Sequence, residues 1–319
     1  MNYKQLGISG VRVSEICLGT GFRGQKDDVI CEKTIHRALD LGCNFVDCAN
    51  FYGRGRSETI VGKALKGVRD DVILTTKVFS PMGEGPNDSG LSRFSMMREI
   101  ERSLKRLQTD HVDIYLQHNI DVDTPSEEIL RAMDDVVQQG KATYVGSCNH
   151  TAWRLMEHIG ICEANGLAPQ VVTQNNYSLL HRYDVEGELQ EVVEKYGMGV
   201  MTYSPLAIGL LSGLFREGQT PPAGTPWTDG RRDLNATLTA QVEGVIQLLV
   251  DIGDQTGKSP AQVAINWILS QPFIAAPVIG PDTPEHVDDV FGGTGWDLDS
   301  SHKAALDDAS STPHAHNLV

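Results

Sequence analysis

Four residues with complementary chemistry stand at or just after the ends of short apolar runs: Asp47, Tyr52, Lys77 and His118. Taken singly, each has an ordinary structural interpretation, as a helix cap, a half-buried aromatic, a surface charge or a core histidine. Together they supply what the reduction of a carbonyl group, or its reverse, requires: a phenol to transfer the proton and an imidazole to polarise the same oxygen. We expect Lys77 to lower the pKa of the Tyr52 phenol, and Asp47 to keep the buried Lys77 ammonium charged.

The elements that must position these residues recur along the chain as apolar, β-branched runs with helical segments between them. Runs such as residues 72–74 and 199–201 lack polar alternation, which is typical of parallel strands covered on both faces. Their spacing, mostly about thirty residues, is that of one strand followed by one crossover helix. Eight such units favour a closed barrel over an open doubly wound sheet. We therefore predict one α/β domain over residues 1–319, a (β/α)8 TIM barrel whose strands end near Leu18, Val46, Thr76, Leu116, Gly146, Thr173, Thr202 and Ile279.

Two segments stand outside the repeating unit. Residues 3–6 and 11–13, separated by the turn 7–10, predict an N-terminal β-hairpin that could cap the bottom of the barrel. Residues 213–235 are long, polar and rich in glycine and proline, and they follow the seventh strand. A loop of this length inside a compact domain is usually functional, and this one lies on the face where barrel enzymes hold their active sites.

The composition of the chain limits the kinds of partner that it can bind. The 319 residues carry 27 Lys+Arg against 42 Asp+Glu, a net charge of −15, and this balance argues against nucleic acid and anionic membranes. No apolar run is long enough for a membrane span and the start lacks a signal-peptide core, so we expect a cytoplasmic protein. The six cysteines contain no C-x-x-C pair, which predicts reduced thiols and no metal site. The sequence leaves the oligomeric state open.

A second interpretation comes from residues 19–24, which read G-x-G-x-x-G after the first strand. With Asp47 at the end of the next strand, this fingerprint alone would indicate a Rossmann fold. However, its last glycine should open the helix directly, whereas residues 25–28 read as a further turn with a helix cap. We therefore favour the barrel, in which these glycines let the backbone pass close to a cofactor while Phe22 and Arg23 face the substrate.

Longer stretches of the chain resemble the aldo-keto reductases, and within them the bacterial and potassium-channel β-subunit-like branch. The resemblance implies a TIM barrel that binds a nicotinamide dinucleotide without a Rossmann domain. It also implies that Tyr52 is the general acid and base, with Asp47, Lys77 and His118 completing a catalytic tetrad. The matching stretches lie in order over essentially the whole chain, at residues 44–47, 52–53, 57–58, 75–77, 113–118, 174–178 and 203–207.

The resemblance further implies a cofactor site. Asn149 and Gln174 would bind the nicotinamide carboxamide, and Tyr203 would stack on the ring. The pyrophosphate would lie along residues 204–209 and the adenosine end near Gly280. The expected cofactor contacts are Gly19, Thr20, Asp47, Cys148, Asn149, Gln174, Tyr203, Ser204, Pro205, Leu206, Gly209, Gly280, Asp282 and His286. The expected substrate pocket is Phe22, Arg23, Phe51, Tyr52, His118 and Trp227.

Three features depart from the family pattern. Cys148 stands where a serine usually joins Asn149, and His150 replaces a usual aromatic residue. Residues 279–289 contain no Lys or Arg that could grip a 2′-phosphate, and an acidic residue such as Asp282 favours NAD(H). The family usually prefers NADP(H), and Arg231 and Arg232 could reach its 2′-phosphate. The choice between the two cofactors therefore stays open.

The function that the resemblance implies is an NAD(P)(H)-dependent oxidoreductase. It would interconvert a small-molecule carbonyl (an aldehyde, ketone or keto-sugar) and its alcohol by hydride transfer, with Tyr52 handling the proton. The alternative is a dinucleotide-binding redox sensor or regulatory subunit with little turnover, as channel β-subunits of this fold are.

Overall fold

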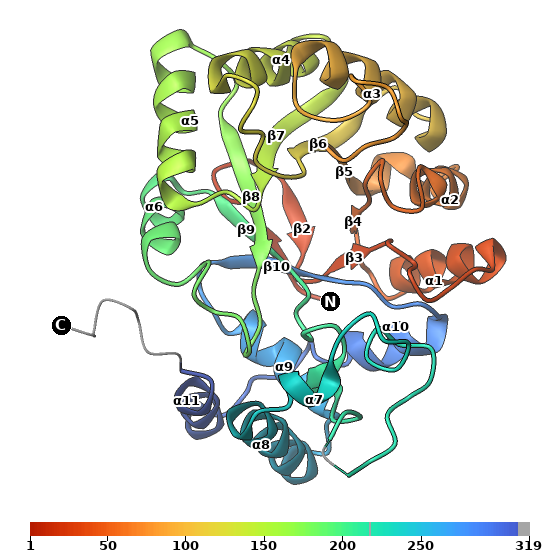
Figure 1. Cartoon of the computed structure of the whole chain (residues 1–319), viewed down its shortest axis with the longest axis vertical. Coiled ribbons are helices and arrows are strands. Elements are labelled where there is room, and N and C mark those ends of the chain that lie inside the picture. Colours follow the sequence, from red (N-terminus) through yellow and green to blue (C-terminus); the bar gives the residue numbers. More distant parts are fainter. Residues whose placement is uncertain (217, 312–319) are drawn as a thin grey trace.

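A computed structural model describes residues 1–216 and 218–311, and its centre is a closed barrel of eight parallel strands (Figure 1). The order around the barrel follows the chain, with the last strand returning beside the first. The predicted barrel is confirmed, and the Rossmann interpretation of residues 19–24 is wrong because the strand before them, Cys17–Gly19, belongs to this closed barrel. The strands are β3 (Cys17–Gly19), β4 (Phe45–Asp47), β5 (Ile73–Val78), β6 (Val112–Gln117), β7 (Ala142–Cys148), β8 (Gln170–Asn176), β9 (Gly199–Tyr203) and β10 (Ile274–Ile279).

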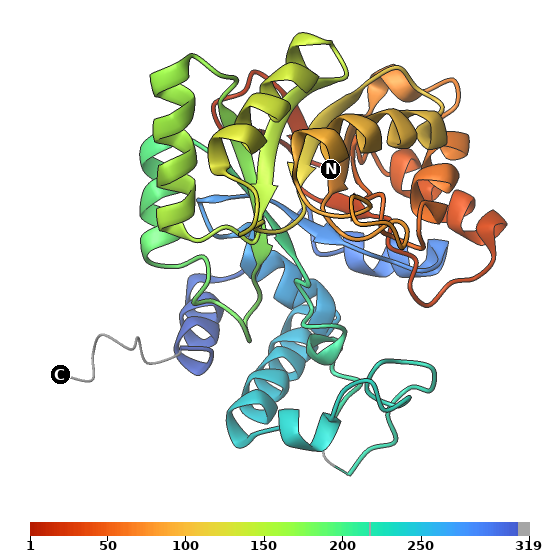
Figure 2. The ribbon, with the colours of Figure 1, turned by 45° about the horizontal axis from the view of Figure 1, so that its top comes forward.

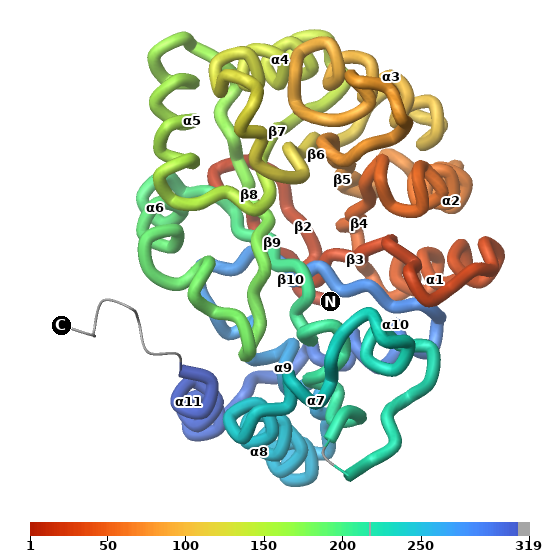
Figure 3. The backbone as a smooth tube through the Cα atoms, viewed as in Figure 1, coloured from red at the N-terminus to blue at the C-terminus, as the bar shows by residue number. Residues whose placement is uncertain are grey.

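Helices surround the barrel and cover its outer face (Figure 1). The α8 helix packs on α9, and α11 packs in turn on α8, as the tube in Figure 3 also shows. No helix in the described part of the chain is both long and apolar enough to cross a membrane. The helices are α1 (Asp28–Asp40), α2 (Arg56–Ala64), α3 (Arg93–Leu107), α4 (Ser126–Gln138), α5 (Ala152–Asn165), α6 (Glu188–Tyr196), α7 (Leu234–Thr237), α8 (Ala240–Thr256), α9 (Pro260–Leu269), α10 (Pro284–Phe291) and α11 (Ser300–Ala309).

The strands are apolar on both faces because both faces are buried. One set of their side chains fills the barrel interior together with residues of the hairpin, and includes Phe45, Ile114, Leu116 and Met201. The opposite set packs under the helices in two larger clusters. A segment buried on both faces cannot show the polar alternation of a half-buried strand, and this explains the uninterrupted runs in the sequence.

The N-terminal hairpin closes the lower end of the barrel, as predicted. Its strands β1 (Tyr3–Gln5) and β2 (Arg12–Ser14) pair antiparallel, and Leu6 and Val13 are fully buried in the barrel interior. Gly7 has a φ of +54°, and an added Cβ there would collide with the backbone nitrogen of Gly199 at the start of β9. A glycine is therefore required where the hairpin meets the barrel.

The long loop after β9 begins with a 3-10 turn, Leu210–Ser212, and ends at α7. Trp227 is buried in a small cluster with Leu210 and Phe215, and its indole nitrogen donates to the carbonyl oxygen of Ile208 at 2.8 Å. In Figure 2 this green-to-cyan segment extends beyond the barrel wall. The loop therefore has a hydrophobic core of its own.

Candidate active site

The four predicted catalytic side chains meet at the carboxyl end of the barrel. Asp47 ends β4, Lys77 lies in β5, His118 follows β6, and Tyr52 lies on the loop after β4. The Lys77 ammonium donates to the Asp47 carboxylate at 2.5 Å, to the carbonyl oxygen of Cys48 at 2.9 Å and to the Tyr52 hydroxyl at 3.2 Å. A proton-carrying phenol is thus in direct contact with a buried ion pair.

The ion pair is fully enclosed, with Lys77 0% and Asp47 1% exposed. Burial opposes the charged form of Lys77, but Asp47 and Tyr52 outweigh it, so the pKa of Lys77 is raised. Burial raises the pKa of Asp47, against the opposing effects of Lys77 and Gln174. Lys77 therefore remains an ammonium at neutral pH, as expected from its partner.

Tyr52 differs from the expectation. Burial raises the pKa of its phenol, and this effect exceeds the lowering by Lys77. The expected lowering by Lys77 is present, but the net pKa is raised because the buried phenolate would lose its water and Asp47 opposes the ammonium. Tyr52 consequently carries its proton at neutral pH, in the form that can donate it.

His118 lies edge-on to Tyr52, with the ring centroids 5.6 Å apart and the planes at 76°. Burial, followed by the charges of Lys77 and Arg23, lowers the pKa of His118 to about 3. Its Nδ1 atom is buried and has no hydrogen-bond partner among the described residues. A neutral imidazole with an unused ring nitrogen can bind an oxygen or amide of a ligand.

Asp47, Tyr52 and His118 line a cavity of about 320 Å³, which is small for a ligand pocket, and Lys77 lies buried behind them. A short polar network forms its wall. Gln174 donates to Asp47 at 3.1 Å, Asn149 donates to the carbonyl oxygen of His118 at 3.1 Å, and the Tyr203 hydroxyl donates to Asn149 at 2.8 Å. The lining residues are Gly19, Gly21, Arg23, Asp47, Tyr52, His118, Cys148, Asn149, Gln174, Tyr203, Ser204, Val278 and Gly280.

The backbone at the rim is strained. Phe22, Asn149 and Ser204 are not glycines, yet they have φ values of +42°, +61° and +54°. Ala207 and Ile208, just beyond β9, share this left-handed conformation. Such residues cost on the order of 1–3 kcal/mol each and cluster at functional sites.

Several expected site residues lie elsewhere. Among the expected substrate contacts, Phe22 is 5% exposed inside the core, Phe51 is exposed on the surface, and Trp227 is buried in the cluster of the long loop. The Thr20 side chain bonds to the Asp47 backbone and to Ser57, below the cavity. The expected cofactor contacts that do not line the cavity are Thr20, Pro205, Leu206, Gly209, Asp282 and His286.

Two lining residues were not singled out from the sequence. Gly21 belongs to the glycine motif after β3, where only the motif as a whole signalled an approach to a ligand. Val278 lies on β10, two residues before Gly280, which directly follows that strand, so strand alternation places both positions on the same face. This alternation is the signal that could have identified Val278.

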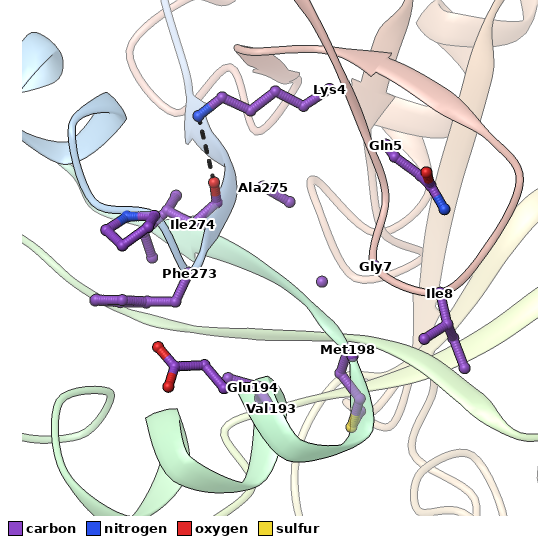
Figure 4. A pocket seen from close by; sticks show the side chains of 13 residues that line it. Lys4, Gln5, Gly7, Ile8, Val193, Glu194, Met198, Phe273, Ile274 and Ala275 are labelled. Carbon is purple, nitrogen blue, oxygen red and sulfur yellow. Dashed lines mark hydrogen bonds between the residues drawn. The ribbon is translucent and has the colours of Figure 1, made fainter.

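A second pocket, of about 530 Å³, lies at the other end of the barrel, between the hairpin and the starts of β9 and β10 (Figure 4). The Lys4 ammonium there donates to the carbonyl oxygens of Leu269 and Ile274 at 3.3 and 3.5 Å. Lys4 thus ties the hairpin to the barrel floor. None of the four catalytic candidates lies at this end.

An eight-stranded barrel has a phenol, a carboxylate and a neutral imidazole around one cavity, with an ammonium in contact with the first two. This is the architecture of a barrel oxidoreductase. Comparisons agree. Residues 15–310 match the Aldo/keto reductase family. A Bacillus subtilis (strain 168) protein named "Uncharacterized oxidoreductase YrpG" is 38% identical over 99% of both chains. Proteins named "Probable voltage-gated potassium channel subunit beta" from Oryza sativa subsp. japonica and Arabidopsis thaliana are 36% and 35% identical over 88% of this chain and 87% of theirs.

The chain belongs to the aldo/keto reductase family. It is therefore an oxidoreductase that acts on a small molecule with a nicotinamide cofactor. The six cysteines are all buried, and none of them forms a disulfide in the structure.

Proposed function

We propose that this oxidoreductase interconverts a carbonyl compound and its alcohol, with Tyr52 as general acid and base. The observation that supports this best is the 3.2 Å contact between the Tyr52 hydroxyl and Lys77, which is itself held by Asp47 at 2.5 Å. Both Tyr52 and His118 line the same cavity. A carbonyl oxygen that reaches the phenol can therefore meet the imidazole as well.

The residues around the cavity fit a nicotinamide dinucleotide. The amides of Asn149 and Gln174 and the ring of Tyr203 suit a nicotinamide carboxamide and its ring, and Gly19 and Gly280 leave a strip of wall without side chains. The unpartnered nitrogen of His118 offers one further polar contact. When bound, the nicotinamide supplies or accepts the hydride.

The protein's own residues transfer one proton and orient the carbonyl group. In the reducing direction, Tyr52 gives its proton to the carbonyl oxygen and becomes a phenolate beside Lys77. The ammonium stabilises that phenolate, and Asp47 keeps Lys77 charged and in place. His118 stays neutral and hydrogen-bonds the substrate oxygen, which orients the carbonyl group. In the oxidising direction the same groups act in reverse.

NAD(H) is the preferred cofactor in this proposal. Gly24 lets the Asp282 carboxylate come close to the glycine-motif backbone, where it disfavours a 2′-phosphate. The arginines that could bind such a phosphate are engaged elsewhere. Arg231 pairs with Asp229 at 2.7 Å, and Arg232 lies over the Trp227 ring at 5.7 Å.

The alternative, a regulatory subunit with little turnover, is favoured by the names of the plant relatives. Tyr52→Phe in the full chain, assayed with NADH and NADPH over aldehydes and ketones, tests both functions. Turnover should fall by about 10²–10⁴-fold while dinucleotide affinity stays within a few-fold.

The matched control is Tyr183→Phe, which removes an exposed hydroxyl and should leave turnover unchanged. Unchanged turnover in Tyr52→Phe would remove Tyr52 from the mechanism. Tight dinucleotide binding by the unmodified protein with no turnover over the whole panel would favour the regulatory alternative.

A further inference from the structure

One charged side chain of the cavity is left without a partner. Arg23 lines the same cavity as Tyr52 and His118. Within residues 1–216 and 218–311, Arg23 has neither an ion pair nor a hydrogen bond. Since Lys77 and Asp47 neutralise each other and His118 is neutral, the cavity carries one uncompensated positive charge.

The chain turns sharply to place this arginine. Phe22 adopts a φ of +42° and its ring is buried in the core, whereas Arg23 is exposed to the cavity. The Cγ and Nε atoms of Arg23 lie 3.9 Å from where a Cβ on Gly21 would stand, so the side chain lies over a wall residue of the cavity. Its charge also acts on His118, whose pKa it helps to lower.

Several other arginines that follow barrel strands have carboxylate partners at 2.7 to 2.8 Å: Arg56 with Asp28, Arg98 with Asp88, Arg154 with Glu157 and Arg182 with Glu186. Arg54, which follows β4, has no such partner among the described residues, but it does not line the cavity. In a chain with 42 acidic residues and a net charge of −15, an arginine without a carboxylate at the cavity stands out. The N–H donors of its guanidinium are therefore available to a ligand in the cavity.

We propose that Arg23 binds an anionic group of the substrate, so that the enzyme prefers carbonyl compounds that carry a carboxylate or a phosphate. This inference rests on the proposed carbonyl chemistry of the same cavity. A guanidinium presents a planar fork of donors that matches either anion. The acidic surface elsewhere repels such a substrate, so an isolated cation beside the reacting groups would both attract and orient it. The dinucleotide's own phosphates are the competing ligand, and the measurement of dinucleotide affinity described below distinguishes the two.

The test compares substrates of similar shape and different charge. The kcat and KM of the full-length enzyme are measured for 3- and 4-carboxybenzaldehyde and for their methyl esters. Since the ester group withdraws more electrons from the aldehyde than the carboxylate does, the preference is taken from KM and from its change between variants. The variants are Arg23→Gln, Arg23→Lys and the control Arg54→Gln. Arg54 is an exposed arginine two residues after Tyr52, so its replacement changes the net charge equally but outside the cavity. Dinucleotide affinity is measured for each variant by quenching of protein fluorescence.

A charge-assisted hydrogen bond corresponds to about 10- to 100-fold in affinity. We expect the parent enzyme to favour at least one acid over its ester by that factor, mainly in KM. Arg23→Gln should abolish the preference, Arg23→Lys should keep part of it, and Arg54→Gln should keep all of it.

Turnover of the esters without any preference for the acids would overturn the role of Arg23 while leaving the proposed function standing. An equal loss on acids and esters in Arg23→Gln, together with weaker dinucleotide binding, would assign Arg23 to the cofactor and overturn the proposal. Absence of turnover for acids and esters alike would overturn the proposed function, and this inference with it.

Discussion

Two buried histidines, His150 and His158, should make the stability of the protein depend on pH. Each is 1% exposed, and their rings meet edge to face with centroids 5.0 Å apart. His150 donates through Nδ1 to the carbonyl oxygen of Cys148 at 2.8 Å, and His158 accepts from Gln170 at 3.0 Å. Both interactions suit neutral rings, and a charge on either ring would be buried beside the other.

The expected effect follows from the pKa values. Burial, opposed by the hydrogen bond to Cys148, lowers the pKa of His150 from 6.5 to about 4, and burial with the neighbouring ring lowers that of His158 to about 3. Below pH 6.5 these two histidines bind protons in the unfolded chain but not in the native state. The free energy of unfolding therefore falls as the pH decreases. Between pH 7 and pH 5, each such histidine removes about 2 kcal/mol from the free energy of unfolding. This is a large share of the 5–15 kcal/mol typical of a domain.

The perturbation is His158→Gln, whose side-chain oxygen can still accept from Gln170. Equilibrium urea unfolding of parent and variant at pH 7, 6 and 5 gives the slope of the free energy of unfolding against pH. The variant should lose about 2 kcal/mol less than the parent between pH 7 and pH 5. The control is His36→Gln, which removes a histidine at an exposed position on α1 and leaves the His150–His158 pair intact. Equal slopes for His158→Gln and the parent would refute the idea that these rings are neutral because they are buried.

Two further predictions concern the active site itself. Lys77→Met should destabilise the protein by about 3–5 kcal/mol, because Asp47 is left buried without its counterion, and Lys77→Met combined with Asp47→Asn should recover part of that loss in urea unfolding. If Lys77→Met alone were as stable as the parent, the account of the ion pair would be contradicted. Asp282→Arg should raise kcat/KM for NADPH relative to NADH, and an unchanged ratio would move the cofactor choice to the long loop after β9.

The fold could be predicted almost completely from the sequence, for a physical reason. Parallel strands buried on both faces produce apolar runs without alternation, and the crossover helices set their spacing. The eight strands therefore appeared at the predicted places, and so did the hairpin. The glycine motif was ambiguous only in isolation, because its helix begins after a further turn. Asp27 caps α1 there by accepting from the Val29 backbone nitrogen at 2.8 Å.

The substrate side of the cavity could not be predicted in this way. Phe22 and Trp227 have the residue type expected of a substrate wall, but a left-handed turn sends the first into the core and a local cluster buries the second. Residue type also misled on Tyr52, because the sequence shows an ammonium near a phenol but not how deeply the phenol is buried. Loop conformation and depth of burial depend on tertiary packing, and a linear pattern contains neither.

The charges of the site have a consequence for its chemistry. Burial raises the pKa of Tyr52, so the resting site holds the proton on the phenol. Once that proton leaves, the phenolate faces the Lys77 ammonium at 3.2 Å. The ammonium is therefore used most fully after the proton has moved, which is the condition for stabilising a transition state more than the bound substrate. Raising the phenol's pKa by burial and placing an ammonium beside it are thus complementary parts of one acid catalyst.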